Sequence, residues 1–266
     1  MDFNDAQLER YSRHIILKDV GIEGQEKLGQ ARILVVGAGG LGSPALLYLA
    51  AAGIGTLGIA DGDTLDLSNL QRQVIHFTAD IGKAKVLSAR EKIEQLNPDV
   101  KVQVHQEMLT AANIMDIIKE YDFVIDGTDN FPAKFLVNDA CVLAGVPFSH
   151  GGILRFFGQT FTILPKESAC YRCVFLKPPP ANVVPTCSQA GVIGVIAGIL
   201  GTLQANEAIK FALGKGELLT DRLLTFDALT TEFREVKLRR NPTCPVCVTG
   251  AITDLKDYEQ AACAFR

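Results

Sequence analysis

The stretch that decides the fold is Ile33-Leu34-Val35-Val36-Gly37-Ala38-Gly39-Gly40-Leu41-Gly42. Its first four residues form a β-branched and leucine run, which is typical of a buried strand. The glycines predict a tight turn into a helix over residues 41–52, with Ser43 as its cap and Pro44 in its first turn. Glycines let the backbone approach a phosphate, and the free N–H groups at a helix start point toward it. This stretch therefore predicts a phosphate-binding turn.

A second strand over residues 56–60 ends directly before Asp61, twenty-four positions after Gly37. A carboxylate at this position can accept hydrogen bonds from ribose hydroxyl groups. The two segments together predict a nucleotide site.

Strands and helices alternate along the rest of the first half. Further strands are predicted over 100–105, 123–125 and 147–150, and helices over 81–96, 113–120 and 132–144. This alternation predicts an α/β fold, Rossmann-like and doubly wound, with a mostly parallel sheet. From residue 156 the pattern changes, and alternating segments at 158–164, 223–227 and 232–238 predict an antiparallel extension. We expect one domain over 1–266, with a nucleotide-binding half at about 1–155 and a second half at about 156–266.

Composition restricts the class of protein. The chain has 266 residues, 48% of them hydrophobic, and a net charge of −4, so no general basic field favours nucleic acid. The N-terminus has no apolar signal region, and the longest apolar run, residues 192–203, is shorter than the roughly 20 residues that span a bilayer. We expect a cytoplasmic protein without a membrane or nucleic-acid partner.

Seven cysteines in such a protein indicate metal or thiol chemistry. Two C-x-x-C pairs, at Cys170/Cys173 and Cys244/Cys247, fit a tetrahedral structural zinc site. A redox pair is the alternative, although two matched pairs would then be a coincidence. Cys141 falls on an apolar helix and is most simply a core residue, and nothing assigns a role to Cys263.

Polar residues surround the predicted nucleotide site. Asn69, Arg72 and Lys85 supply groups suited to a triphosphate. Asp129 supplies an oxygen ligand for Mg²⁺, and it lies with Asn130 at the carboxyl end of a strand. We expect Lys83 and Lys85 in the first turn of the helix over 81–96, where cations oppose the helix dipole. None of the four histidines falls inside these motifs.

Cys187 lies in a predicted loop after the run Pro178-Pro179-Pro180. A thiol there could be a nucleophile or an ordinary exposed side chain. No neighbouring histidine or lysine indicates an activated thiol.

These motifs occur together in one family. The chain resembles the bacterial ubiquitin-activating-enzyme-like adenylyltransferases, which activate the sulfur carriers of molybdopterin and thiamine biosynthesis. The resemblance covers nearly the whole chain, and Val248 after Cys247 departs from the glycine common in many relatives. The matching positions are the glycine turn with Ser43, Asp61, Ser68-Asn69-Leu70-Gln71-Arg72-Gln73, Lys85, Thr128-Asp129-Asn130 and the two C-x-x-C pairs.

The resemblance implies a set of roles. It implies that Arg13 reaches the phosphates from the other subunit of a homodimer, that the four paired cysteines bind Zn²⁺, and that Asp129 binds Mg²⁺. Cys187 matches a position that forms a covalent bond to the carrier or its sulfur donor in some members. The residues implied to bind ATP are Gly37, Gly39, Gly40, Gly42, Asp61, Ser68, Asn69, Arg72, Lys85, Asp129 and Asn130.

The resemblance also implies a reaction and a partner. The substrate would be a β-grasp sulfur-carrier protein ending in Gly-Gly, bound by the second half of the chain, whose terminal carboxylate attacks the α-phosphate to give an acyl-adenylate and pyrophosphate. That carboxylate is already ionised at pH 7, so charge neutralisation by Arg13, Arg72, Lys85 and Mg²⁺ replaces a general base. Because the chain ends at Arg266, we expect a separate sulfur donor protein. The pathway stays open, and an NAD-dependent oxidoreductase of the same fold and a non-catalytic carrier-binding scaffold stay as alternatives.

Overall fold

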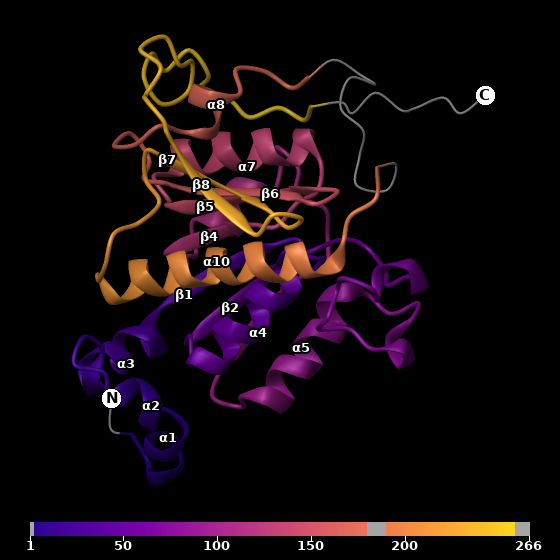
Figure 1. Cartoon of the computed structure of the whole chain (residues 1–266), viewed down its shortest axis with the longest axis vertical. Coiled ribbons are helices and arrows are strands. Elements are labelled where there is room, and N and C mark those ends of the chain that lie inside the picture. The colour runs from indigo at the N-terminus through magenta and orange to yellow at the C-terminus, as the bar shows by residue number, and fades with distance from the viewer. Residues whose placement is uncertain (1–2, 180–189, 259–266) are drawn as a thin grey trace.

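The computed structural model describes residues 3–179 and 190–258, and these residues form one mixed sheet of eight strands (Figure 1). The strands are β1 (Arg32–Val36), β2 (Thr56–Ala60), β3 (Lys101–His105), β4 (Phe123–Asp126), β5 (Phe148–Leu154), β6 (Phe157–Ile163), β7 (Arg222–Asp227) and β8 (Glu232–Lys237). They lie side by side in the order β3-β2-β1-β4-β5-β6-β7-β8.

The sheet has a parallel part and an antiparallel part. β3, β2, β1, β4 and β5 pair in parallel, whereas β5 to β8 pair antiparallel. Parallel neighbours need long crossovers, and helices supply them in the first half of the chain. β5 and β6 instead follow each other through Arg155 and Phe156, and Arg155 has a positive φ of 56°. The predicted parallel sheet with an antiparallel extension is confirmed.

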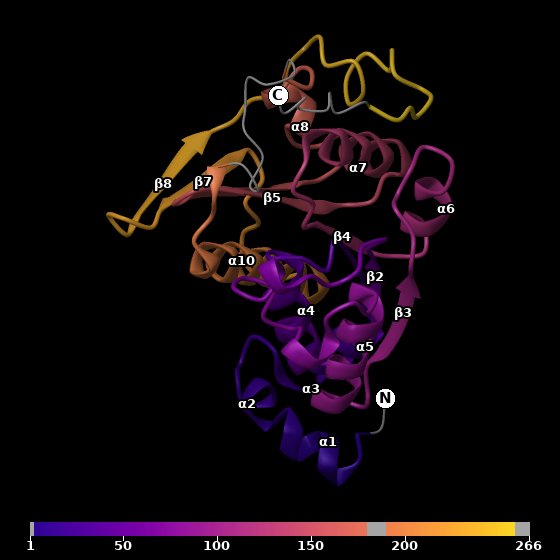
Figure 2. The ribbon, with the colours of Figure 1, turned by 90° about the vertical axis from the view of Figure 1, so that its right-hand side faces the viewer.

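Helices cover both faces of the sheet, which makes the fold doubly wound. Figure 2 shows the sheet between α7 on one side and α10 with α4 on the other. The main helices are α3 (Gly21–Gln30), α4 (Gly42–Ala52), α5 (Lys85–Leu96), α6 (Ile114–Ile118), α7 (Phe131–Ala144), α8 (Tyr171–Val174) and α10 (Gly194–Leu213). None of the described helices combines the length and the apolar character needed to cross a membrane.

Alternate residues of β1 supply the two layers of the core. Ile33 and Val35 pack in one buried cluster with residues of α4, α5 and α10, and Leu34 and Val36 pack in another with residues of α6 and α7. Both faces of a central parallel strand are buried in this way, which explains its continuous apolar sequence.

The chain begins with two short helices, α1 (Asp5–Arg10) and α2 (Ser12–Ile15), separated at Tyr11. The helical spacing of Leu8, Tyr11 and Ile15 predicts one helix over 6–18, and the structure shows that this prediction is wrong. The side chain of Tyr11 is buried, and its hydroxyl oxygen accepts a hydrogen bond from Asn97 at 2.9 Å. This contact joins the break between α1 and α2 to the end of α5, where Asn97 is the C-cap.

The predicted cap of α4 and the predicted start of α5 are also wrong. α4 begins at Gly42 with Leu41 as its N-cap, and Ser43 lies inside the first turn without capping it. α5 begins at Lys85, so Lys83 lies before it. The backbone N–H of Lys85 donates to the carbonyl of Asp63 at 3.0 Å, because the loop after β2 packs against this helix start.

Candidate functional site

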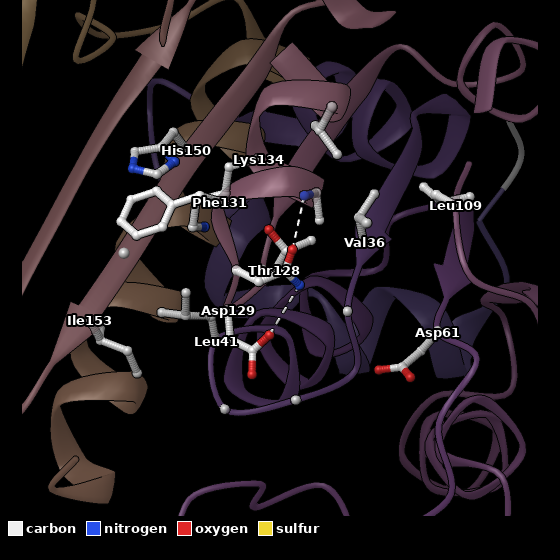
Figure 3. A pocket seen from close by; sticks show the side chains of 18 of the residues that line it. Val36, Leu41, Asp61, Leu109, Thr128, Asp129, Phe131, Lys134, His150 and Ile153 are labelled. Carbon is white, nitrogen blue, oxygen red and sulfur yellow. Dashed lines mark hydrogen bonds between the residues drawn. The ribbon is translucent and has the colours of Figure 1, made fainter. Parts of the chain in front are cut away.

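A cavity of about 460 Å³ lies at the carboxyl ends of β1, β2 and β4 (Figure 3). The chain crosses from one side of β1 to the other between β3 and β4, and ligands bind at such a reversal in open α/β sheets. The residues that line this end of the cavity include Gly37, Gly39, Gly40, Asp61, Asp63, Arg72, Lys85, Asp129 and Asn130.

The glycine turn is built by close backbone packing. Gly37 has a φ of +91°, and a Cβ atom on it would lie 2.9 Å from the carbonyl oxygen of Gly127, which follows β4. A Cβ atom on Gly42 would lie 1.8 Å from the carbonyl oxygen of Gly37. Gly39 and Gly40 line the cavity, whereas Gly42 does not. Gly42 therefore serves the packing of the turn, and Gly39 and Gly40 face a ligand.

Asp61 is oriented by two backbone groups. Its Oδ2 accepts a hydrogen bond from the N–H of Ala38, and its Oδ1 accepts one from the N–H of Asp63, both at 2.8 Å. Burial raises the pKa of Asp61, against the lowering effect of Lys85 and of these two N–H groups. The carboxylate keeps further lone pairs that can accept hydrogen bonds from ribose hydroxyl groups.

Two cationic side chains line the same end of the cavity. The ammonium group of Lys85 lies 2.7 Å from Oδ2 of Asp63, and Lys85 is buried while Asp63 is exposed. Arg72 donates to the carbonyl oxygen of Ser68 at 3.1 Å. Asp63 was not among the predicted site residues, although it follows the predicted Asp61 by two positions. The side chains of Arg72 and Lys85 can neutralise the charge of a bound polyphosphate.

Asp129 and Asn130 follow β4, as predicted. Asn130 caps α7, since its Oδ1 accepts a hydrogen bond from the N–H of Ala133 at 2.9 Å. Asp129 is exposed at the cavity, where its carboxylate has oxygen atoms available for a cation (Figure 3).

A buried trio, formed by Asp126, Lys134 and His150, was not predicted. Oδ2 of Asp126 accepts hydrogen bonds from Lys134 at 3.1 Å and from Nδ1 of His150 at 2.9 Å. Oδ1 of the same residue accepts from the hydroxyl of Thr128 at 2.6 Å, and Lys134 also donates to the carbonyl of Gly151. Burial would raise the pKa of Asp126, but Lys134, His150 and Thr128 hold it below its usual range. The trio fixes the loop that presents Asp129.

His150 has one ring nitrogen without a hydrogen-bond partner in the part of the chain that the structure describes. Burial and then Lys134 lower the pKa of His150 from 6.5 to about 4, so the ring is neutral at pH 7. Its Nδ1 carries the proton that it donates to Asp126, and Nε2 is buried without a hydrogen-bond partner among the described residues. His150 itself is one of the residues that line the cavity.

Several predicted residues lie outside the cavity in this chain. Arg13 is exposed on α2 and is not a lining residue. Ser68 and Asn69 form the short 3₁₀ helix η1 (Leu67–Asn69), where the side chain of Asn69 accepts a hydrogen bond from the N–H of Asp66. Cys187 and Cys263 lie outside the described residues.

The four paired cysteines come together, as predicted. Their sulfur atoms all lie within 4.8 Å of one another. The Sγ atoms of Cys170 and Cys244 are 3.6 Å apart, and those of Cys173 and Cys247 are 3.4 Å apart. Tetrahedral zinc with four thiolates at about 2.3 Å separates the sulfurs by about 3.8 Å. The donor set therefore fits Zn²⁺, whereas Cys141 lies apart in the core on α7.

The glycine turn, the oriented carboxylate and the two cations in one cavity define a nucleotide-binding α/β protein of the Rossmann type. Residues 11–246 match the model of the ThiF family, and the chain belongs to this family.

Two relatives align with almost the full length of this chain and of their own. The sulfur carrier protein adenylyltransferase of Thermus thermophilus is 46% identical over 272 residues, which covers 100% of both chains. The SAMP-activating enzyme E1 of Haloferax volcanii is 44% identical, and the match covers 100% of this chain and 98% of that protein.

A longer relative is the probable adenylyltransferase/sulfurtransferase MoeZ of Mycobacterium tuberculosis. It is 48% identical over 96% of this chain, but the chain spans only 64% of the length of that protein. Among solved structures, that of E. coli MccB with MccA-N7isoASN has a TM-score of 0.79 at 23% identity, covering 92% of this chain and 75% of MccB. That structural likeness supports the fold.

Proposed function

We propose that this chain is an ATP-dependent adenylyltransferase that activates the C-terminal glycine carboxylate of a ubiquitin-like sulfur-carrier protein. The observation that carries the proposal is the cavity itself, which joins an oriented Asp61 to Arg72 and Lys85 at a glycine turn. The end-to-end match with a sulfur carrier protein adenylyltransferase supports this substrate class.

In this proposal the two ends of ATP meet different groups. Asp61 accepts hydrogen bonds from the ribose, and the N–H groups of the glycine turn meet the phosphates. Arg72 and Lys85 neutralise the polyphosphate, and Asp129 holds Mg²⁺. Ser68 and Asn69 act through the position of Arg72, because the carbonyl of Ser68 accepts a hydrogen bond from it.

The reaction requires no general base. The carrier carboxylate is ionised at pH 7, and its attack on the α-phosphate forms an acyl-adenylate and releases pyrophosphate. Positioning and charge neutralisation then supply the catalysis. This fits a site in which a histidine that lines the cavity, His150, is neutral and donates its one proton to Asp126.

Several further roles belong to the same proposal. Arg13 completes the phosphate site from the second subunit of a homodimer, and Cys187 acts as a thiol nucleophile. A separate protein donates the sulfur, and the enzyme works in the cytoplasm.

The two halves of the chain divide these tasks. Residues of about 1–155 bind the nucleotide, and residues of about 156–266 bind the carrier and hold Zn²⁺ at Cys170, Cys173, Cys244 and Cys247. Sulfur carriers of the molybdopterin and thiamine pathways both fit this scheme.

The test is ATP–pyrophosphate exchange by the purified protein with Mg²⁺, with and without small carriers that end in Gly-Gly. We expect exchange with one carrier only, which would also identify the pathway. Nucleotide binding without exchange for any carrier would favour a carrier-binding scaffold. A spectral change on addition of NAD would instead favour an oxidoreductase of the same fold.

A further inference from the structure

His76 holds the glycine turn from behind the cavity. Its Nε2 lies 3.0 Å from the carbonyl oxygen of Ala38, and its Nδ1 lies 2.8 Å from Oγ of Ser88. His76 and Ser88 are buried, and neither they nor Ala38 lines the cavity. The contact is therefore made on the side of the turn away from a ligand.

The partners of the ring fix its protonation. A carbonyl oxygen only accepts, so Nε2 must carry the proton that it donates to Ala38. Burial lowers the pKa of His76, which leaves Nδ1 unprotonated and able to accept from the hydroxyl of Ser88. The imidazole thus donates one hydrogen bond, through Nε2, and accepts one, through Nδ1.

The geometry of the peptide bond carries this contact to the ligand side. The carbonyl of Ala38 and the N–H of Gly39 belong to one planar trans peptide, and they point in opposite directions. With the carbonyl held toward His76, the N–H of Gly39 points the other way, and Gly39 lines the cavity. No backbone hydrogen bond from this N–H is found within residues 3–179 and 190–258. The group is available to a phosphate oxygen.

Ser88 links the same turn to the cation of the site. Ser88 lies on α5 about one turn after Lys85, which is one of the residues that line the cavity. His76 therefore bridges the phosphate-binding backbone and the helix that presents Lys85.

We propose that His76 is a positioning residue for phosphate binding. It orients the N–H of Gly39 toward the ATP phosphates, and it fixes the position of the glycine turn relative to Lys85 on α5. The inference rests on the proposed use of ATP. It adds a residue that sets the affinity for phosphate without touching the nucleotide.

The test compares two variants that divide the functions of the imidazole. In His76→Gln, the amide NH₂ reaches the place of Nε2 and can donate to Ala38. In His76→Asn, the shorter side chain reaches only the place of Nδ1, which leaves the carbonyl of Ala38 without this partner. ATP affinity is measured by titration calorimetry with Mg²⁺ and without a carrier, and adenosine affinity by ligand-observed NMR.

We expect His76→Asn to weaken ATP binding by about tenfold and His76→Gln to stay close to the original protein, because losing a buried hydrogen bond costs about that factor. Adenosine lacks phosphates, so its affinity should not change in either variant. His105→Asn serves as a control, because it removes a half-buried histidine that bonds Tyr121 and does not line the cavity.

Equal weakening of ATP by both His76 variants would overturn the inference, as would an equal loss of ATP and adenosine affinity in His76→Asn. These outcomes are independent of carrier activation. A protein that binds ATP but never releases pyrophosphate contradicts the proposed function and leaves this comparison intact.

Discussion

At the scale of the residue, Asp129 is the exposed carboxylate at the cavity on which the proposed Mg²⁺ site depends. We expect Asp129→Ala to lower the rate of pyrophosphate exchange by at least about 100-fold, because the bound Mg²⁺ that neutralises the phosphates is lost. Zinc content and the melting temperature should stay unchanged, since the side chain is exposed. Normal turnover in this variant would contradict the assignment.

The lowered pKa of His150 predicts how the free energy of unfolding depends on pH. Its pKa is about 4 in the folded protein and near 6.5 when exposed, so the unfolded chain binds more protons between these values. Stability therefore falls as pH is lowered through this window. We expect the free energy of unfolding to drop less from pH 7 to pH 5 in His150→Gln than in the original protein, measured by chemical denaturation. Equal drops would contradict the role of His150.

The sequence predicted the residues of the site that follow a recognisable strand or turn, such as Asp61 and Asn130. It did not predict the trio of Asp126, Lys134 and His150, because these residues meet only through the pairing of β4 with β5 and the packing of α7. Lys134 was the available signal, as a charged residue in an otherwise apolar stretch of helix. Local sequence cannot identify its partner.

At the scale of the element, α10 packs closely against the start of α4. A Cβ atom on Gly201 would lie 2.2 Å from the carbonyl oxygen of Leu41, whereas one on Gly198, in the same helix, would meet nothing within 4 Å. We expect Gly201→Ala to destabilise the protein by about 1–3 kcal/mol and to weaken ATP binding, because Leu41 adjoins the glycine turn.

Gly198→Ala is the matched control. Alanine is favoured over glycine in a helix interior by up to about 1 kcal/mol, so this variant should be neutral or more stable. Thermal unfolding of the two variants makes the comparison. Equal effects of the two substitutions would show that the close contact between Gly201 and Leu41 does not stabilise the glycine turn.

The predicted elements were correct in type more often than in their bounds. The apolar runs indicated β1 and β2 because, after Arg32 and Thr56 at their first positions, strands buried on both faces continue with non-polar residues. The start of α5 was misplaced because loop contacts, such as the bond from Lys85 to Asp63, determine it rather than a capping side chain. Tyr11 divided the first predicted helix for the same reason, since its partner Asn97 is distant in sequence.

At the scale of the whole molecule, the four cysteines attach the end of the chain to its body. Residues 239–258 contain no helix or strand. They are held by Cys244 and Cys247, by the contact of Tyr258 with Arg172, and by the bond from the N–H of Ala111 to Asp257 at 2.8 Å. The cysteine site is therefore one of the contacts that attach this segment, beside the packing of Ile252 and Leu255 against the core.

We expect a zinc chelator, or Cys244→Ser, to release zinc and to speed amide hydrogen exchange across residues 239–258. Exchange in β1 and β4 should change little, because their hydrogen bonds are buried in the sheet. Mass spectrometry of the exchanged peptides measures both regions. A protein purified without zinc, or unchanged exchange in the terminal segment, would contradict the structural role of the metal.

The spacing of the cysteines also has a consequence for synthesis on the ribosome. Cys170 and Cys173 emerge about seventy residues before Cys244 and Cys247, which corresponds to roughly 4–14 s of translation. During that interval the nucleotide-binding strands are already outside the ribosome, while the cysteine site has only two of its four ligands. For the proposed Zn²⁺ site this means that metal binding by all four cysteines can only follow the synthesis of Cys247, and a nascent chain that stalls before Cys244 has two of the four ligands.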